Sequence, residues 1–295
     1  MVCVAQPVIQ VDELARTFRS RKGLFRRTGK EVEAVKGVSF AVERGELFGL
    51  LGPNGAGKTT TIKMLITLLM PTGGQARVLG HDVVDDARDV RRKVGYVFGG
   101  DRGLYERLSG LDNLRYFAEL YGVPPRESKQ RIAELLELVG LDGREKERVE
   151  GYSRGMRQRL HIARGLLHRP EVLFLDEPSI GIDPVGAREL RATVKNLVDT
   201  GTTVLLTTHY MFEADELCDR IAVIAQGRIV ALDTPAGLKQ QVATGSVLEV
   251  DVFGLPDGVV EKVRAEPDVL AVAVEVQGQA EVLTVHARPG TDVTP

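Results

Sequence analysis

A glycine-rich segment, GPNGAGKT at residues 52–59, constrains the fold of this 295-residue chain more than any other feature. It follows a short apolar run, ELFGLL at residues 46–51, and precedes TTTIKMLITLLM, a helix that we expect Pro71 to end. The pattern G-x-x-x-x-G-K-T between a strand and a helix is typical of phosphate-binding loops. Its glycines let backbone N–H groups turn inward around phosphate oxygens, and the helix start adds its positive dipole end. The sequence therefore predicts a nucleotide-binding α/β fold.

Side chains of this segment complete the expected binding loop. Lys58 is expected to reach the β- and γ-phosphates, and the Thr59 hydroxyl is expected to bind Mg²⁺. The predicted cofactors are thus ATP and Mg²⁺. The predicted ATP-contacting residues of the loop are Gly52, Pro53, Asn54, Gly55, Ala56, Gly57, Lys58, Thr59 and Thr60.

Two further buried strands predict the catalytic side of the site. VLFLD, at residues 172–176, ends in Asp176, a carboxylate expected to bind Mg²⁺ beside Thr59. Glu177 follows directly and is placed to accept the proton of the attacking water, a contribution typically of about 10² to 10⁴ in rate. His209 follows TVLLTT and is expected at the same strand edge, within reach of the γ-phosphate. The predicted catalytic residues are Glu177, His209 and Lys58.

Hydrophobic periodicity predicts the arrangement of the rest of the chain. Residues 8–14 and 32–42 alternate like half-buried antiparallel strands, and residues of about 105–168 read as an inserted helical subdomain. Strands that alternate with helices imply a mostly parallel sheet. We therefore predict a cassette over residues 1–240, with an N-terminal antiparallel β subdomain, followed by a small C-terminal α+β domain, of order β-α-β-β, over residues 245–295.

Composition narrows the class of protein. The longest apolar stretches, such as residues 64–70, fall short of the roughly 20 residues that span a bilayer, and the first residues lack a secretory signal pattern. We therefore expect a chain that stays in the cytoplasm. Cys3 and Cys218 fit no metal or redox spacing and are read as unpaired thiols. A net charge of −2 offers no global field for nucleic acid.

One segment is strongly basic. RSRKGLFRRTGK, at residues 19–30, carries six basic residues and no acidic one. A solvated loop between two strands and a contact with anionic lipid headgroups or a partner both explain it, and we favour the loop because charge runs usually only need water.

Five motifs in order and spacing carry a resemblance to a known family: GPNGAGKTT, YSRGMRQRL at residues 152–160, VLFLDEP, SIGID and TTH. The chain resembles ABC ATPases from about Val8 to Leu238. The resemblance implies a head-to-tail dimer in which Ser153 and Gly155, in the signature motif YSRGMRQRL, contact ATP held by the partner. It also implies that Asp183 lies in the D-loop at the dimer seam. Phe18 is similar to the aromatic residue that stacks on adenine, although Phe25 competes for that role.

Two departures from the family pattern stand out. After VGYVF the family usually has glutamine, the Q-loop residue, whereas this sequence reads Gly99-Gly100-Asp101. Asp101 is a candidate substitute, although glycine pairs followed by aspartate are more often turns. Within the signature, Arg154 replaces the usual first glycine and Met156 the usual glutamine.

The overall style of the motifs is most similar to drug-resistance and ABC-2 type exporter ATPases. This resemblance implies an ATP-hydrolysing subunit that powers a separately encoded membrane-spanning subunit, sits at the cytoplasmic face of the membrane, and pairs with an identical or related subunit. Two alternatives stay open: an importer ATPase, and a soluble ABC ATPase acting on nucleic acid or the ribosome. The latter usually has two cassettes or a long coiled coil, so we expect no nucleic acid partner.

Overall fold

The structure is a computed structural model that describes residues 6–19, 31–99, 103–242, 246–252, 258–264, 266–277 and 280–287. Cys3, Phe25, Asp101 and all but the first residue of the basic run fall outside these ranges. The chain divides into two compact units, residues 1–235 and 236–295, which are described separately.

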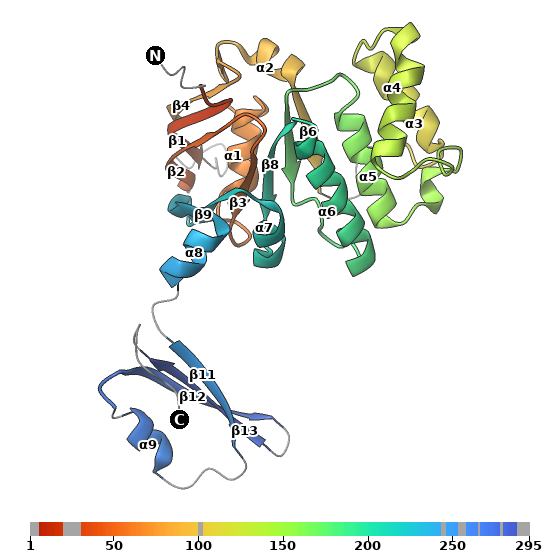
Figure 1. The fold of residues 1–295 in the computed structure, drawn as a ribbon. Helices are drawn as coiled ribbons and strands as arrows, with labels where there is room; N and C mark the ends of the chain where they lie inside the picture. The colour runs from red at the N-terminus through yellow and green to blue at the C-terminus, as the bar shows by residue number, and fades with distance from the viewer. Residues whose placement is uncertain are drawn as a thin grey trace, which may run out of the picture. The chain divides into compact units, whose positions relative to one another are not determined.

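A six-stranded sheet forms the centre of the first unit (Figure 1). Its strands, in spatial order, are β10 (Arg228–Asp233), β9 (Arg220–Ala225), β3 (Leu47–Leu51), β8 (Thr203–Thr208), β7 (Val172–Asp176) and β6 (Val94–Phe98). All neighbours are parallel except β10, which runs antiparallel to β9. Every residue of β3, β7 and β8 is buried, as expected for continuous apolar runs in a parallel sheet. The predicted mostly parallel sheet is confirmed.

An antiparallel sheet at the N-terminus packs against this central sheet (Figure 1). In spatial order it contains β2 (Glu31–Val42), β1 (Ile9–Arg19), β4 (Gly73–Val78) and β5 (His81–Asp82). The stacked rings of Phe40 and Phe48, whose centroids lie 5.2 Å apart, join the two sheets in one apolar core. The predicted antiparallel β subdomain is confirmed, and β1 extends five residues beyond the predicted end at Leu14.

The helix after the glycine-rich loop is shorter than predicted. α1 spans Lys58–Leu65, so it ends well before Pro71. Thr67 adopts a left-handed backbone with φ of 64°, and the amides of Leu68 and Leu69 both donate to the carbonyl of Lys63. Such a backbone is unusual for a β-branched residue, and Arg91 Nη1 helps to fix it by donating to Thr67 Oγ1 at 2.8 Å. This distant contact has no signal in the local sequence.

Helices form a separate group beside the β6 edge of the sheet (Figure 1). They are α3 (Gly110–Leu120), α4 (Pro125–Leu138), the short 3₁₀ helix η1 (Val149–Gly151) and α5 (Arg154–Gly165). Leu114, Ile132 and Leu160 are fully buried between them. Ser109 and Ser153 cap α3 and α5, each accepting a hydrogen bond from the amide three residues later. The predicted inserted helical subdomain is confirmed.

The remaining helices of the first unit connect its strands. They are α2 (Ala87–Lys93), α6 (Pro184–Asp199) and α7 (Met211–Leu217). After β10 comes α8 (Pro235–Val242), which belongs to the second unit except for its first residue. Across the described residues, each helix is too short or too polar to span a lipid bilayer. Cys218, directly after α7, is a buried free thiol.

The second unit is a small α+β structure. Its elements are β11 (Ser246–Val252), α9 (Val259–Arg264), β12 (Val269–Gln277) and β13 (Ala280–Ala287). The strands form an antiparallel sheet of order β11-β13-β12, and α9 contacts β12. Leu283 and Val285 on the central strand are buried.

His161 is an unusual member of the helical subdomain. It is 1% exposed in α5, and neither ring nitrogen has a hydrogen-bond partner in the described part of the chain. Burial, with a smaller contribution from the positive charge of Arg164, lowers the pKa of His161 to about 3. The unfolded chain binds this proton at about pH 6.5. Protein stability contributed by this position therefore falls as pH decreases from about 6.5 towards 3.

Replacing His161 by leucine should raise the free energy of unfolding at pH 7 by about 1–3 kcal/mol, because two unpaired buried nitrogens are removed. The same substitution should reduce the loss of stability between pH 7 and pH 5, because leucine takes up no proton in the unfolded chain. Urea unfolding at both pH values measures the two effects. His168→Leu is the contrast at pH 7, since it deletes a ring nitrogen 3.0 Å from the Val94 carbonyl. A less stable His161→Leu protein at pH 7 would contradict the view that the unpaired, buried ring of His161 destabilises the fold.

Candidate nucleotide-binding site

The glycine-rich loop joins β3 to α1 and lies tightly against neighbouring strands. A Cβ atom at Gly52 would lie 2.2 Å from the Ile224 carbonyl oxygen, so the backbone there admits no side chain. Gly57, the residue before α1, has φ of 112°, a left-handed conformation that favours glycine. These two glycines allow the tight path of the loop between β3 and α1.

Lys58 is buried inside this loop at 3% exposure. Its Nζ donates to the carbonyl oxygens of Gly52 at 2.7 Å and Pro53 at 3.1 Å, and lies 3.1 Å from Glu177 Oε1. A cavity of about 170 Å³ opens here. It is lined by Ala34, Asn54, Gly55, Gly57, Lys58, Thr59, Thr60 and Glu177. The buried ammonium group of Lys58 and the position of this hollow at the start of α1 make it suitable for phosphate.

Asp176 lies at the carboxyl end of β7, facing the loop. Its Oδ1 accepts hydrogen bonds from Thr59 Oγ1 at 3.0 Å and Thr207 Oγ1 at 2.6 Å, and its Oδ2 accepts one from the Tyr96 hydroxyl at 3.4 Å. Thr59 lines the cavity, and Asp176 lies within hydrogen-bond distance of its hydroxyl. A carboxylate beside a hydroxyl is the kind of oxygen donor set that Mg²⁺ prefers. The residues present therefore fit a magnesium ion, which Thr59 and Asp176 would hold.

Glu177 lies between two potential cations. Its Oε2 is 3.2 Å from His209 Nδ1, an ionic distance without the alignment of a hydrogen bond, and its Oε1 faces Lys58. Its backbone has φ of 49°, and its N–H donates to both oxygens of Thr207. Such left-handed backbones cost on the order of 1–3 kcal/mol and are concentrated at functional sites. Three predicted catalytic residues, Lys58, Glu177 and His209, thus meet in one cluster.

The signature residues lie elsewhere, where α5 meets α6. Ser153 caps α5, and a Cβ atom at Gly155 would lie only 3.2 Å from Gly186 Cα, so the two helices approach closely. Asp183 caps α6 by accepting hydrogen bonds from Gly186 and Val185, and these bonds, led by Gly186, hold the pKa of its carboxyl below the usual value. Neither Ser153 nor Gly155 lines the phosphate cavity of its own chain.

The two residues of the signature motif that depart from the family pattern, Arg154 and Met156, lie in different surroundings. Arg154 Nη1 donates to the Gly181 carbonyl at 3.1 Å, so it joins the signature to the D-loop. Met156 is buried.

Phe18 also lies outside the phosphate cavity. It is 39% exposed on β1, and the guanidinium of Arg16 lies 4.8 Å from its ring centroid.

The structure adds two residues that sequence reasoning missed: Thr207 and Tyr96, both bonded to Asp176. Asp176 is paired with Thr207 on one side and Phe98 on the other, and Tyr96 lies two residues before Phe98 on the same strand. The polar residues near the ends of VGYVF and TVLLTT could therefore have been predicted as partners of Asp176, but only if the strand order β6-β7-β8 had been known.

The position of the missing Q-loop glutamine also has a structural explanation. A Cβ atom at Gly99 would lie 2.5 Å from the Glu177 carbonyl oxygen and 2.7 Å from that of Asp176. The chain leaves β6 so close to β7 that no side chain fits at Gly99 without a backbone shift. Asp101, the candidate substitute, lies outside the described residues.

A parallel sheet with a phosphate loop after one strand and an Asp-Glu pair after another defines a P-loop nucleoside triphosphatase. Comparisons with known proteins narrow this class. Residues 35–180 match the family described as ABC transporter. The chain is 39% identical over 253 residues to the linearmycin resistance ATP-binding protein LnrL of Bacillus subtilis (strain 168), covering 85% of this chain and 81% of the relative.

A second relative and a solved structure agree with this match. The chain is 48% identical over 219 residues to the fluoroquinolones export ATP-binding protein Rv2688c of Mycobacterium tuberculosis (strain ATCC 25618 / H37Rv), covering 74% of this chain and 71% of the relative. A solved structure titled as the ATP binding subunit of an ABC transporter aligns with a TM-score of 0.65 and 30% identity, over 80% of this chain and 93% of that one. The chain belongs to the ABC transporter family and is an ATP-binding, ATP-hydrolysing subunit of it.

Proposed function

We propose that this chain is the Mg²⁺-dependent ATPase of an ABC exporter and that it drives a separately encoded membrane-spanning subunit from the cytoplasmic face. The observation that carries the direction of transport is the identity of its relatives. Rv2688c is named for fluoroquinolone export and LnrL for linearmycin resistance, and each is matched over more than two thirds of its length. The substrate class we propose is accordingly drug-like small molecules.

The chemistry follows from the cluster around Glu177. The ammonium of Lys58 lies 3.1 Å from the Glu177 carboxylate. The β- and γ-phosphates of bound ATP attract that ammonium more strongly than one carboxylate does, so binding releases Glu177. Glu177 then takes a proton from the attacking water. The water oxygen bonds to the γ-phosphorus, and the bond between this phosphorus and the oxygen of the leaving ADP breaks. Thr59 and Asp176 would hold Mg²⁺, which would supply positive charge to neutralise the phosphate oxygens.

We propose a head-to-tail dimer as the active form. Ser153 and Gly155 lie outside their own phosphate cavity, at the capped start of α5, which supports their acting on the partner's ATP. Asp183 and Gly181 lie beside the start of α5: Asp183 caps α6, and the Gly181 carbonyl accepts a hydrogen bond from Arg154. A dimer would therefore join each phosphate loop to the partner's signature, and the helical subdomain would carry the closure to the membrane subunit.

The experiment that tests this function starts from the protein and its membrane partner. The tagged chain is extracted in mild detergent, the co-purifying membrane protein is identified, and the pair is reconstituted into vesicles with the ATPase outside. In this orientation an exporter moves a drug such as a fluoroquinolone into the vesicle on ATP addition, with Glu177→Gln as the inactive control. Movement out of the vesicle would indicate an importer. Co-purification with ribosomes or nucleic acid, without a membrane protein, would indicate the soluble alternative.

A further inference from the structure

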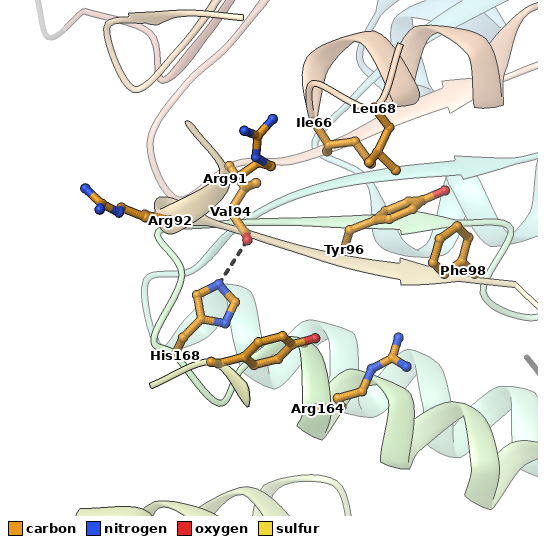
Figure 2. A pocket seen from close by; sticks show the side chains of 11 residues that line it. Ile66, Leu68, Arg91, Arg92, Val94, Tyr96, Phe98, Arg164 and His168 are labelled. Atoms are coloured by element: carbon orange, nitrogen blue, oxygen red, sulfur yellow. Dashed lines mark hydrogen bonds between the residues drawn. The ribbon is translucent and has the colours of Figure 1, made fainter. Parts of the chain in front are cut away.

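A groove of about 610 Å³ lies between the central sheet and the helical subdomain (Figure 2). It is lined by Ile66, Leu68, Arg91, Arg92, Val94, Tyr96, Phe98, Tyr121, Arg164, Gly165 and His168. The lining combines aliphatic and aromatic side chains with the guanidinium groups of two arginines from α2 and one from α5. Leu68 is 58% exposed and Phe98 is 39% exposed, so the groove wall is open to an occupant.

Tyr96 belongs both to this groove and to the nucleotide site. Its ring lines the groove and packs edge-on against Phe98, with ring centroids 4.2 Å apart, as Figure 2 shows. Its hydroxyl donates to Asp176 Oδ2 at 3.4 Å. Burial, followed by the negative charge of Asp176, raises the pKa of Tyr96. Among the described groove residues, Tyr96 alone has a hydrogen bond to the Asp176 side chain.

The neighbouring backbone cannot supply an equivalent link. At Gly99, three residues after Tyr96, the approach to the carbonyls of Asp176 and Glu177 excludes a side chain. The end of β6 is instead fixed from α5, where the buried Gln158 donates from Nε2 to the Phe98 carbonyl at 3.2 Å. Gln158 therefore links α5 to the strand that carries Tyr96.

We propose that Tyr96 is a positioning residue that couples the packing of this groove to the orientation of the Asp176 carboxylate. The inference rests on the proposed function in one respect, the assignment of Asp176 to Mg²⁺. The two hydroxyls on Oδ1 and the one on Oδ2 fix the plane of the carboxylate. A hydrogen bond of 3.4 Å is at the long limit, so a small movement of the ring breaks or shortens it. Because coupling between sites is reciprocal, metal binding must also alter the groove.

The reciprocal effect gives a direct optical test. The sequence contains no tryptophan, so Leu68→Trp places a single reporter in the groove wall. Adding Mg²⁺ to this protein, loaded with a non-hydrolysable ATP analogue, should shift the tryptophan emission. The additional change Tyr96→Phe should abolish the shift and raise the half-saturating Mg²⁺ concentration about three- to tenfold, the effect of one hydrogen bond. Calorimetric titration of the analogue shows that binding persists.

Two controls separate this effect from a general change of the protein. Tyr116→Phe deletes another tyrosine hydroxyl, which lies 3.3 Å from that of Tyr105, and should leave the Leu68→Trp response intact. Leu120→Trp places the reporter on an exposed part of α3 outside the groove lining, and should respond weakly.

A Leu68→Trp response that survives Tyr96→Phe, or its absence while Mg²⁺ and the analogue bind, would overturn the inference. Failure of the unmodified chain to bind the analogue in a Mg²⁺-dependent way would instead overturn the proposed function. A third variant, Phe98→Leu, keeps the Tyr96 hydroxyl and removes the ring against which it packs. Its effect on Mg²⁺ affinity should disappear in a Tyr96→Phe background, whereas additive effects would refute coupling through the hydroxyl.

Discussion

Glu177→Gln is expected to bind MgATP and to hydrolyse it about 10²- to 10⁴-fold more slowly, because the attacking water loses its proton acceptor. The amide keeps the size of the side chain, and the phosphate loop, Lys58 and Asp176 are unchanged. ATP should therefore accumulate in a closed dimer. Single-turnover hydrolysis and gel filtration with and without ATP measure the two effects.

The structure supplies a matched control for this variant. Glu171 lies just before the same strand, is partly exposed, and pairs with Arg44 at 3.1 Å. Exposed pairs of this kind contribute only about 0–1 kcal/mol, so Glu171→Gln should hydrolyse ATP at the normal rate. Turnover of Glu177→Gln close to that of the unmodified chain would move the catalytic role to another residue, with His209, 3.2 Å away, as the first to test.

The sequence predicts the site best where local spacing determines the structure. The loop at residues 52–59 requires glycines at fixed positions, and its placement between a strand and a helix follows from the local apolar pattern. Asp176 and Glu177 are predicted for the same reason, because a buried strand ends at a definite residue. The cluster of Lys58, Glu177 and His209 needed only the rule that parallel strands present their carboxyl ends at one edge.

Features that depend on distant contacts were beyond that reasoning. Thr207 and Tyr96 reach Asp176 only because β8 and β6 lie on either side of β7. Hydrophobic periodicity predicts strands but does not predict their order in the sheet. The left-handed residue Thr67, just after the early end of α1, is bonded to Arg91, which follows α1 by more than twenty residues. The lack of a side chain at Gly99 is visible in sequence as a missing glutamine, whereas its cause, the carbonyl of Glu177, is visible only in the fold.

Mixing two inactive variants, Lys58→Ala and Ser153→Arg, is expected to restore nucleotide trapping. Lys58 lines the phosphate cavity of its own chain, and Ser153 does not. In a head-to-tail dimer, one site of the heterodimer collects both defects, and the other takes an intact lysine and an intact serine from different chains. Random mixing gives half heterodimers, so about one quarter of the sites should be intact.

Trapping is the safer measurement, because coupling between the two sites can suppress turnover when only one is intact. Ser153 also caps α5, and losing that cap costs about 0.5–2 kcal/mol, so thermal melting must show that Ser153→Arg is folded at the assay temperature. If Lys58 and Ser153 served the same nucleotide within one chain, every chain in the mixture would carry a defect and no site would recover. A mixture proven to contain heterodimers, yet unable to trap nucleotide, would therefore refute the shared site and the role assigned to the signature motif at the start of α5.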